Sequence, residues 1–147
     1  MLRLEITTPD RPMFEGEVDS VSLPTPQGEI TILPNHIPLI SIVAPGAITI
    51  RQKDNEQMLA VSRGLVEVDG HAIRVMVDTA DHAEELTEES ILKAKADAEK
   101  LQQEKRADNE GFAEATAILE RELARLKVVR RRRRGRRSSV PPPGSGA

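Results

Sequence analysis

Three histidines are the first residues to consider, because imidazole can bind a metal or act as a general base near neutral pH. His36, His71 and His82 lie far apart in the sequence, without i,i+4 or other ligand spacing, whereas a metal site needs several convergent ligands. His36 alone stands in an apolar stretch, between Pro34 and Pro38. It could be a metal ligand, a catalytic base or a structural residue, of which a hydrogen-bonded structural residue is the commonest.

Other groups that could do chemistry lack a suitable context. Cys is absent, which excludes thiolate nucleophiles, disulfides and Cys-ligated metals. The acidic pairs Asp78/Asp81 and Glu84/Glu85 lie in a predicted linker, whereas a general acid needs a shielded pocket. Neither GxxxxGK[ST] nor GxGxxG occurs, so no phosphate-binding loop is recognisable. The sequence therefore argues against an enzyme that acts alone, and we expect no catalytic residue, metal or cofactor.

Composition limits the classes of partner. Trp and Tyr are absent and Phe occurs twice, so the aromatic faces on which nucleic-acid bases stack are missing. The sequence contains no run of about 18 apolar residues, the length that indicates a membrane-spanning helix, and its N-terminus lacks the apolar segment of a secretory signal. We therefore expect no specific nucleic-acid partner, and membrane association only through a complex or through surface charge.

The first part of the chain, up to about Asp78, alternates apolar and polar residues, as in Leu2–Ile6. A period of two puts one face of a strand on a core and the other in water. Turn formers such as Pro45-Gly46 and Asp69-Gly70 separate the runs. The pattern predicts an antiparallel sandwich or barrel of about eight to ten strands within residues 1–82, with a tight hairpin turn at Asp69-Gly70.

A helical period replaces the alternation from about residue 83. Thr87 is the expected N-cap of a first helix. One apolar face of that helix then carries Ile91, Ala94, Ala98 and Leu101. A second helix should place a stripe against the first, formed by Leu119, Leu123 and Leu126. The predicted antiparallel hairpin covers residues 83–129. Because isolated helices of this length are marginal in water, the hairpin must be stabilised by packing against the sandwich, by packing of its two helices against each other, or by a partner.

The last segment, residues 130–147, holds seven arginines and no acidic residue. Adjacent arginines repel each other, and Pro, Gly and Ser do not build a core, so the segment is predicted to be a disordered basic tail. A solvated tail, a phosphate-binding tail and a tail that contacts acidic protein or lipid surfaces all fit this composition. Because Trp and Tyr are absent and no nucleic-acid-binding fold is recognisable, nucleic-acid binding would be accidental rather than functional.

Four stretches carry a resemblance to a known family. They read "GEITILPNHIPLI" from Gly28, "PGAITI" from Pro45, "SRGLVEV" from Ser62 and "IRVMVDTADHAEEL" from Ile73. In this order they resemble the epsilon subunit of the F-type ATP synthase, over roughly residues 2–129. The resemblance implies a ten-stranded β-sandwich followed by a two-helix domain, in a non-catalytic subunit of the central-stalk rotor that proton flow turns.

The resemblance also implies partners. The sandwich would bind the gamma subunit and touch the c-subunit ring, with Glu29 at the c-ring contact and His36 close to the gamma-facing surface. The complex would lie on the cytoplasmic face of the bacterial plasma membrane. The hairpin would either fold against the sandwich or extend toward the alpha and beta subunits and restrain ATP hydrolysis. Its expected regulatory residues are Leu119, Arg121, Leu123, Arg125 and Leu126. A stand-alone binding module and a basic-tailed nucleic-acid binder are the alternatives.

The chain departs from the family pattern in three places. Many bacterial members carry [IL]-D-x-x-R-A on the first helix as part of an ATP site, but here Thr87 replaces the Asp and Ser90 replaces the Arg. Arg63 stands at the first position of the usual Gly-Gly pair, so the local backbone could differ. The Arg-rich tail extends beyond the family core. We expect this tail to engage an acidic segment of the beta subunit when the hairpin extends, less strongly at high salt.

The isolated protein should not bind ATP at physiological concentrations. Arg121 and Arg125 match basic positions of the second helix, but the charged groups of the first helix are missing, so only half of the site is present. Titration calorimetry with ATP should give no saturable heat, and a saturable site would contradict the prediction.

Overall fold

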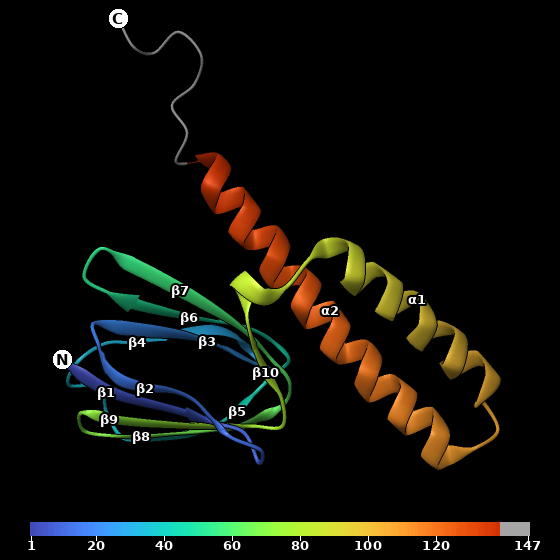
Figure 1. Ribbon diagram of the computed structural model, residues 1–147. Helices are drawn as coiled ribbons and strands as arrows, with labels where there is room; N and C mark the ends of the chain where they lie inside the picture. The colour runs from blue at the N-terminus through green and yellow to red at the C-terminus, as the bar shows by residue number, and fades with distance from the viewer. Residues whose placement is uncertain (139–147) are drawn as a thin grey trace, which may run out of the picture.

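The computed structural model describes the backbone of residues 1–138 and the side chains of residues 1–134. Ten strands form two five-stranded sheets, followed by a short 3-10 turn and two helices (Figure 1). The first sheet contains, in spatial order, β2 (Pro12–Val18), β1 (Leu2–Thr7), β9 (Ala72–Val77), β8 (Gly64–Asp69) and β5 (Leu39–Val43). The second contains β10 (Ala80–His82), β7 (Asn55–Val61), β6 (Gly46–Gln52), β3 (Ser20–Thr25) and β4 (Gly28–Ile32). The predicted β-sandwich is confirmed.

The core of the sandwich lies between the two sheets and follows the alternation in the sequence. Leu2, Leu4 and Ile6 of β1 are fully buried, and β9 supplies Ile73 and Val75 to the same core. The strand pairs are antiparallel except for β1 and β9, which run parallel. The intervening polar residues therefore face outward, as a period of two requires.

The predicted β8–β9 hairpin is present. Asp69 pairs with Ala72, so Gly70 and His71 form the two-residue turn. Gly70 has a φ of 62°, which residues with a Cβ rarely adopt. The His71 carbonyl accepts a hydrogen bond of 2.7 Å from the amide of Arg3. The turn thus adjoins the start of the parallel β1–β9 pairing.

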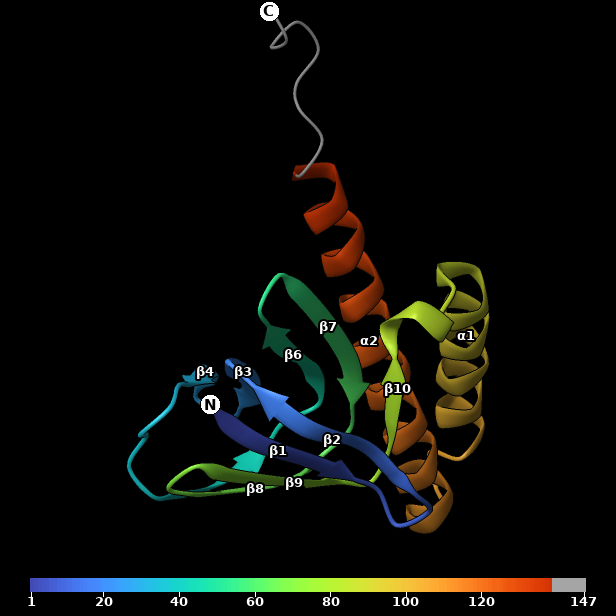
Figure 2. The same cartoon turned by 60° about the vertical axis from the view of Figure 1, so that its left-hand side comes forward.

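Two helices follow the sandwich after the 3-10 turn Ala83–Glu85: α1 (Glu88–Glu104) and α2 (Asn109–Ser138). Thr87 is the N-cap of α1, as predicted, and its side chain accepts a hydrogen bond from the Ser90 amide. The helices run antiparallel, and α2 lies between the sandwich and α1 (Figures 1 and 2). Within residues 1–138, neither helix has a stretch apolar enough to cross a membrane.

The predicted leucine stripe of α2 is only partly correct. Leu126 is buried and Leu119 is half-buried, but Leu123 is 44% exposed. The buried side chains of this region instead occupy alternate positions: Glu122, Ala124, Leu126 and Val128. Residues two apart on a helix point in nearly opposite directions. This pattern arises because α2 packs on two surfaces, with Val128 against Ala47 and Ala60 of the sandwich and its opposite face toward α1.

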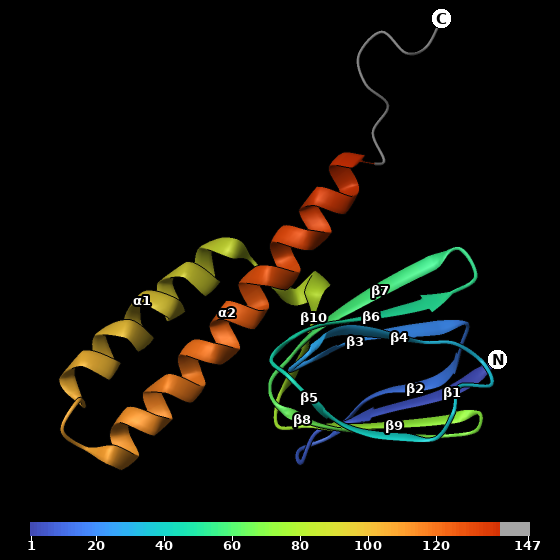
Figure 3. The same ribbon diagram turned by 180° about the vertical axis from the view of Figure 1, so that it is seen from behind.

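The predicted start of disorder at Arg130 was wrong. Helix α2 continues to Ser138, so residues 130–138 are helical (Figure 3). Arginine has a high helix propensity, and carboxylates from other elements pair with three arginines of the run and offset their mutual repulsion. Residues 139–147, the rest of the predicted tail, lie outside the described residues.

Close approach of the backbone makes Gly64 a structural requirement of the β8–β9 pair. A Cβ at this position would lie 2.0 Å from the Met76 carbonyl oxygen and 2.8 Å from the Val77 Cα. The preceding Arg63 needs no unusual backbone, because positive φ angles at non-glycine residues of the described chain occur only at Asn35 and Lys53. The second glycine of the family pair is thus the one that this structure needs.

The Gly64→Ala substitution should destabilise the sandwich by about 3 kcal/mol, because the clash is with backbone atoms that cannot move aside. Gly16→Ala is the matched control, since a Cβ there meets its nearest neighbour at an ordinary 3.7 Å. Urea denaturation of both variants would measure the difference. Equal stabilities would contradict the prediction.

Candidate functional site

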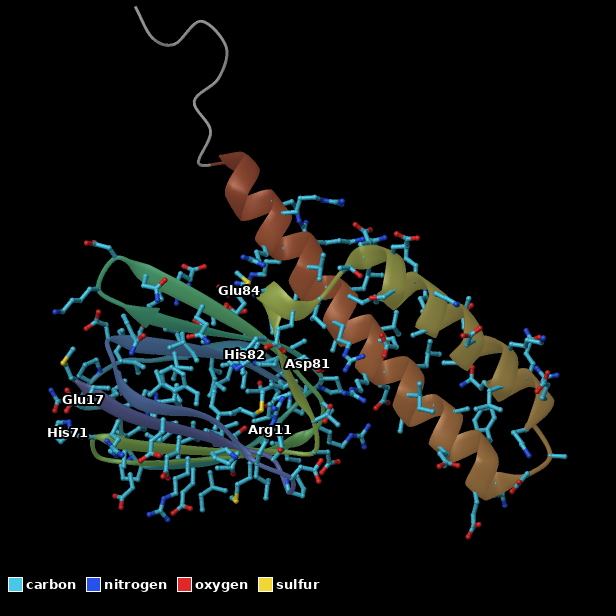
Figure 4. The ribbon with its side chains drawn as sticks, in the orientation of Figure 1. Arg11, Glu17, His71, Asp81, His82 and Glu84 are labelled. Atoms are coloured by element: carbon cyan, nitrogen blue, oxygen red, sulfur yellow. The ribbon has the colours of Figure 1, made fainter. Side chains whose placement is uncertain are left out.

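The candidate site is the contact between α2 and the sandwich, and its centre is Arg125. The Arg125 guanidinium donates to both oxygens of Asp81 on β10, from Nε to Oδ2 at 2.8 Å and from Nη2 to Oδ1 at 2.9 Å. Arg121 approaches the same carboxylate, with Nη2 3.6 Å from Oδ2. Figure 4 shows Asp81 at the end of the sandwich that faces α2. Two predicted hairpin residues thus fasten α2 to the sandwich.

Arg125 also neutralises a carboxylate of its own helix. Its Nη1 donates to Oε1 of Glu122 at 2.8 Å, and Glu122 is only 4% exposed. The second oxygen of Glu122 has no hydrogen-bond partner among the described residues. Burial of a carboxylate is unfavourable unless a cation or several donors satisfy it. Arg125 therefore satisfies two acidic groups at once, and its loss would leave both without their cation.

A second contact and a groove lie beside this centre. Arg63, between β7 and β8, donates from Nη2 to both oxygens of Glu120 on α2, each at 3.2 Å. An adjacent open groove of about 660 Å³ separates part of α2 from the sandwich. Thr79 Oγ1 and Arg121 Nε are buried nearby without a hydrogen-bond partner in the described residues. The helix is therefore attached by separate polar contacts rather than by a continuous packed interface.

An acidic residue of β4 pairs with the basic end of α2. Arg131 Nη1 donates to Oε2 of Glu29 on β4 at 2.8 Å. The hydrogen bond from Arg131 is the main cause that holds the pKa of Glu29 below its usual value. Burial opposes it as the next-largest effect, and the positive charges of Arg131, Arg51 and Lys127 lower the pKa further. Hydrogen bonding to Glu29 raises the pKa of Arg131. The lowered pKa means that this contribution to stability is present above the usual glutamate pKa and is lost as the pH falls through the folded-state value.

The histidines do not converge. His36 is half-buried, and its Nδ1 donates to the Ile37 carbonyl at 2.7 Å, as expected of a hydrogen-bonded structural residue. His82 Nδ1 accepts a bond from Gln57 at 3.1 Å. Figure 4 shows His71 and His82 at opposite ends of the sandwich. Among residues 1–138, no three His, Cys, Asp or Glu side chains gather as metal ligands would.

Sequence reasoning missed Asp81. It set the Asp78/Asp81 pair aside as uninformative, because acidic pairs are common in this chain. Asp81 lies on β10, which pairs with β7 but has only three residues and is too short to show alternation. The available signal was the pair of cations at Arg121 and Arg125, whose i,i+4 spacing places both on one helix face. That signal indicates a carboxylate partner but does not identify it.

The outer face of the first sheet carries an exposed apolar surface. Ile42, Leu65 and Met76 are neighbours across β5, β8 and β9, and each is about half exposed. Ile40, on the same face of β5, is 75% exposed. We call these four residues the outer patch. Because α2 contacts strands of the other sheet, the outer patch stays open, and contiguous exposed apolar surface is typical of protein–protein contacts.

Comparisons with known proteins identify the family. Residues 1–83 match the family model described as the beta-sandwich domain of the ATP synthase Delta/Epsilon chain. Over 130 residues the chain is 35% identical to the ATP synthase epsilon chain of Halalkalibacterium halodurans, covering 88% of this chain and 98% of the relative. The chain belongs to the ATP synthase epsilon chain family. A further family member, from Dichelobacter nodosus, is 45% identical over 97 residues, covering 65% of this chain and 68% of its own.

A solved structure shares the fold. A chain in the cryo-EM structure of the Euglena gracilis mitochondrial ATP synthase superposes with a TM-score of 0.69 at 22% identity, covering 81% of this chain and 75% of that chain. At this identity the likeness shows the fold alone. The β-sandwich followed by helices is therefore an architecture that this chain shares with a chain of a solved ATP synthase assembly.

The Asp81→Asn substitution should loosen the docking of α2 while leaving the sandwich folded. It removes the charge that pairs with Arg125, a loss of about 1–3 kcal/mol because the pair is mostly but not fully buried. Native-state trypsin digestion should cleave α2 about tenfold faster than in the parent protein. Asp78→Asn is the matched control, because Asp78 makes no ion pair among the described residues. Equal cleavage of the two variants would contradict the role of Asp81.

Proposed function

We propose that this chain is a central-stalk rotor subunit of an F-type ATP synthase. It couples proton translocation to ATP synthesis and restrains ATP hydrolysis through its C-terminal hairpin, without being a catalyst itself. Membership of the epsilon chain family and a helical hairpin attached by discrete polar contacts support the proposal. The attachment of the hairpin by discrete polar contacts supports the regulatory part of the proposal, because a subunit that switches needs a domain that can detach.

The sandwich offers two separate surfaces for rotor partners. The outer patch is apolar and uncovered, which suits a stable contact with the gamma subunit. Strand β4 is an edge strand of the second sheet and carries Glu29, and the following turn carries His36. We assign Glu29 on this edge to the c-subunit ring, where the family has an acidic residue, and His36 to the side close to the gamma subunit. Membrane association then arises through the complex alone, on the cytoplasmic face of the bacterial plasma membrane.

The hairpin has the energetics of a two-state element. Its apolar contact is a single small cluster around Val128, formed by Ala47 and Ala60 of the sandwich and Ala83 of the 3-10 turn, with Met58 and Leu86 packed at its edge. The other attachments are ion pairs. The partly exposed pairs of Arg63 and Arg131 contribute only about 0–1 kcal/mol each, whereas loss of the mostly buried Arg125–Asp81 pair costs about 1–3 kcal/mol. The docked state is therefore favoured by a modest free energy, and a partner that prefers the extended hairpin can shift the populations. The alpha and beta subunits would be that partner, and the basic end of α2 suits an acidic segment of beta.

A hydrolysis assay tests the regulatory part of the proposal. The reconstituted enzyme should hydrolyse ATP several-fold faster with a chain that lacks residues 83–147 than with the full chain, because the restraining hairpin is gone. Co-purification of both forms with the gamma subunit is the control for assembly. Equal hydrolysis rates in assembled enzymes would contradict the restraint. Failure of the full chain to bind gamma would instead favour a stand-alone binding module.

A further inference from the structure

The arginine run at the end of α2 pairs with acidic residues from two other elements. Arg131 binds Glu29 of β4 at 2.8 Å. Arg130 Nε and Arg133 Nη1 donate to the two oxygens of Glu88, at 3.2 Å and 2.8 Å. We propose that this run, Arg130–Arg133, is an electrostatic clamp that holds the hairpin closed on the sandwich and whose release allows it to extend.

The clamp lies at one end of α2 and connects that end to two other elements, so its release affects the attachment of the whole hairpin. Glu29 belongs to the sandwich, whereas Glu88 is the first residue of α1. One end of α2 is therefore tied to the sandwich, from which the hairpin must separate, and to the start of α1, just after the 3-10 turn that packs against the sandwich. The Arg125–Asp81 and Arg63–Glu120 contacts secure positions nearer the other end of the helix. Opening at the clamp leaves the remaining attachment dependent on these contacts and the small apolar cluster.

The clamp also explains why a run of like charges is helical. Neighbouring arginines on a helix repel each other, and Glu29 and Glu88 place negative charge beside them. The arginine and glutamate side chains of the clamp are 26–54% exposed. Exposed pairs are screened at physiological ionic strength, so the clamp is weak and sensitive to salt. These properties suit a switch rather than a permanent fastening.

The clamp has a consequence that rests on the proposed function. Glu29 is the residue assigned above to the c-ring contact, and in the closed hairpin its carboxylate is bonded to Arg131. A cationic group of a partner that binds Glu29 must compete with Arg131. Because coupling between two binding events is reciprocal, such a partner loosens the clamp, and a closed clamp weakens the partner's contact with Glu29.

Hydrogen exchange on the isolated full-length chain tests the clamp. A detached hairpin is marginal in water, so its amides exchange when α2 leaves the sandwich. At low ionic strength, Glu88→Gln should increase exchange about three- to fivefold throughout residues 112–128, as expected for the loss of exposed ion pairs. Glu89→Gln is the matched control, because it removes the same charge from the same first turn of α1 but forms no ion pair among the described residues. An equal effect of the two variants would overturn the proposal.

A charge swap tests the second half of the clamp. Arg131→Glu alone should increase exchange of residues 112–128, and the double variant Glu29→Arg/Arg131→Glu should restore protection. Arg132→Glu is the matched control, since Arg132 has no ion pair within the described part of the chain. Failure of the swap to restore protection would contradict the pairing. Faster exchange confined to residues beyond Val128 would show local fraying and overturn the clamp.

ATP hydrolysis by the reconstituted enzyme tests the effect of the clamp on regulation separately from the existence of the clamp. Glu88→Gln leaves the arginines and Glu29 intact, so a clamp that resists extension predicts stronger restraint of ATP hydrolysis by this variant than by Glu89→Gln. Faster exchange in the isolated chain with unchanged hydrolysis would uphold the clamp and contradict the regulatory function. Unchanged exchange would contradict the clamp whatever the enzyme does.

Discussion

The arrangement of the two domains depends on how Arg125 is satisfied. Its guanidinium lies between Asp81 of the sandwich and Glu122 of its own helix, in a setting where the arginine side chain is 18% exposed. Without this cation, the two carboxylates would repel each other and their burial would be unfavourable. The pairing fixes both the rotation of α2 about its axis and its height along the sandwich. That placement brings Val128 onto the small alanine surface of the sandwich.

The other contacts of α2 follow from this placement and are individually weak. Arg63 meets Glu120 on one side, and the arginine run meets Glu29 and Glu88 on the other. The buried side chains that meet Val128 are alanines, which contribute little hydrophobic free energy. The sandwich, in contrast, has a continuous core of leucine, isoleucine and valine. One short chain therefore combines a stable sandwich with a hairpin that can detach. This contrast is the physical basis of the proposed regulation.

Much of the fold could be predicted from the sequence, because its signals are local. Alternation in Leu2–Ile6, the turn at Gly70 and the N-cap Thr87 each specify structure within a few residues. The docking of α2 could not be predicted in the same way. Leu123 completes a regular leucine pattern yet remains exposed, since a helix between two surfaces buries opposite faces. The arginine run looked disordered because its compensating charge, at Glu29, lies about a hundred residues away in the sequence.

The central claim is that the hairpin must leave the sandwich to restrain hydrolysis. The chain contains no cysteine, so Arg63→Cys and Glu120→Cys, introduced together, allow a short bismaleimide to tether α2 to the sandwich before assembly. Enzyme assembled with the tethered chain should hydrolyse ATP as fast as enzyme whose chain lacks residues 83–147. Full restraint by the tethered chain would contradict the central claim.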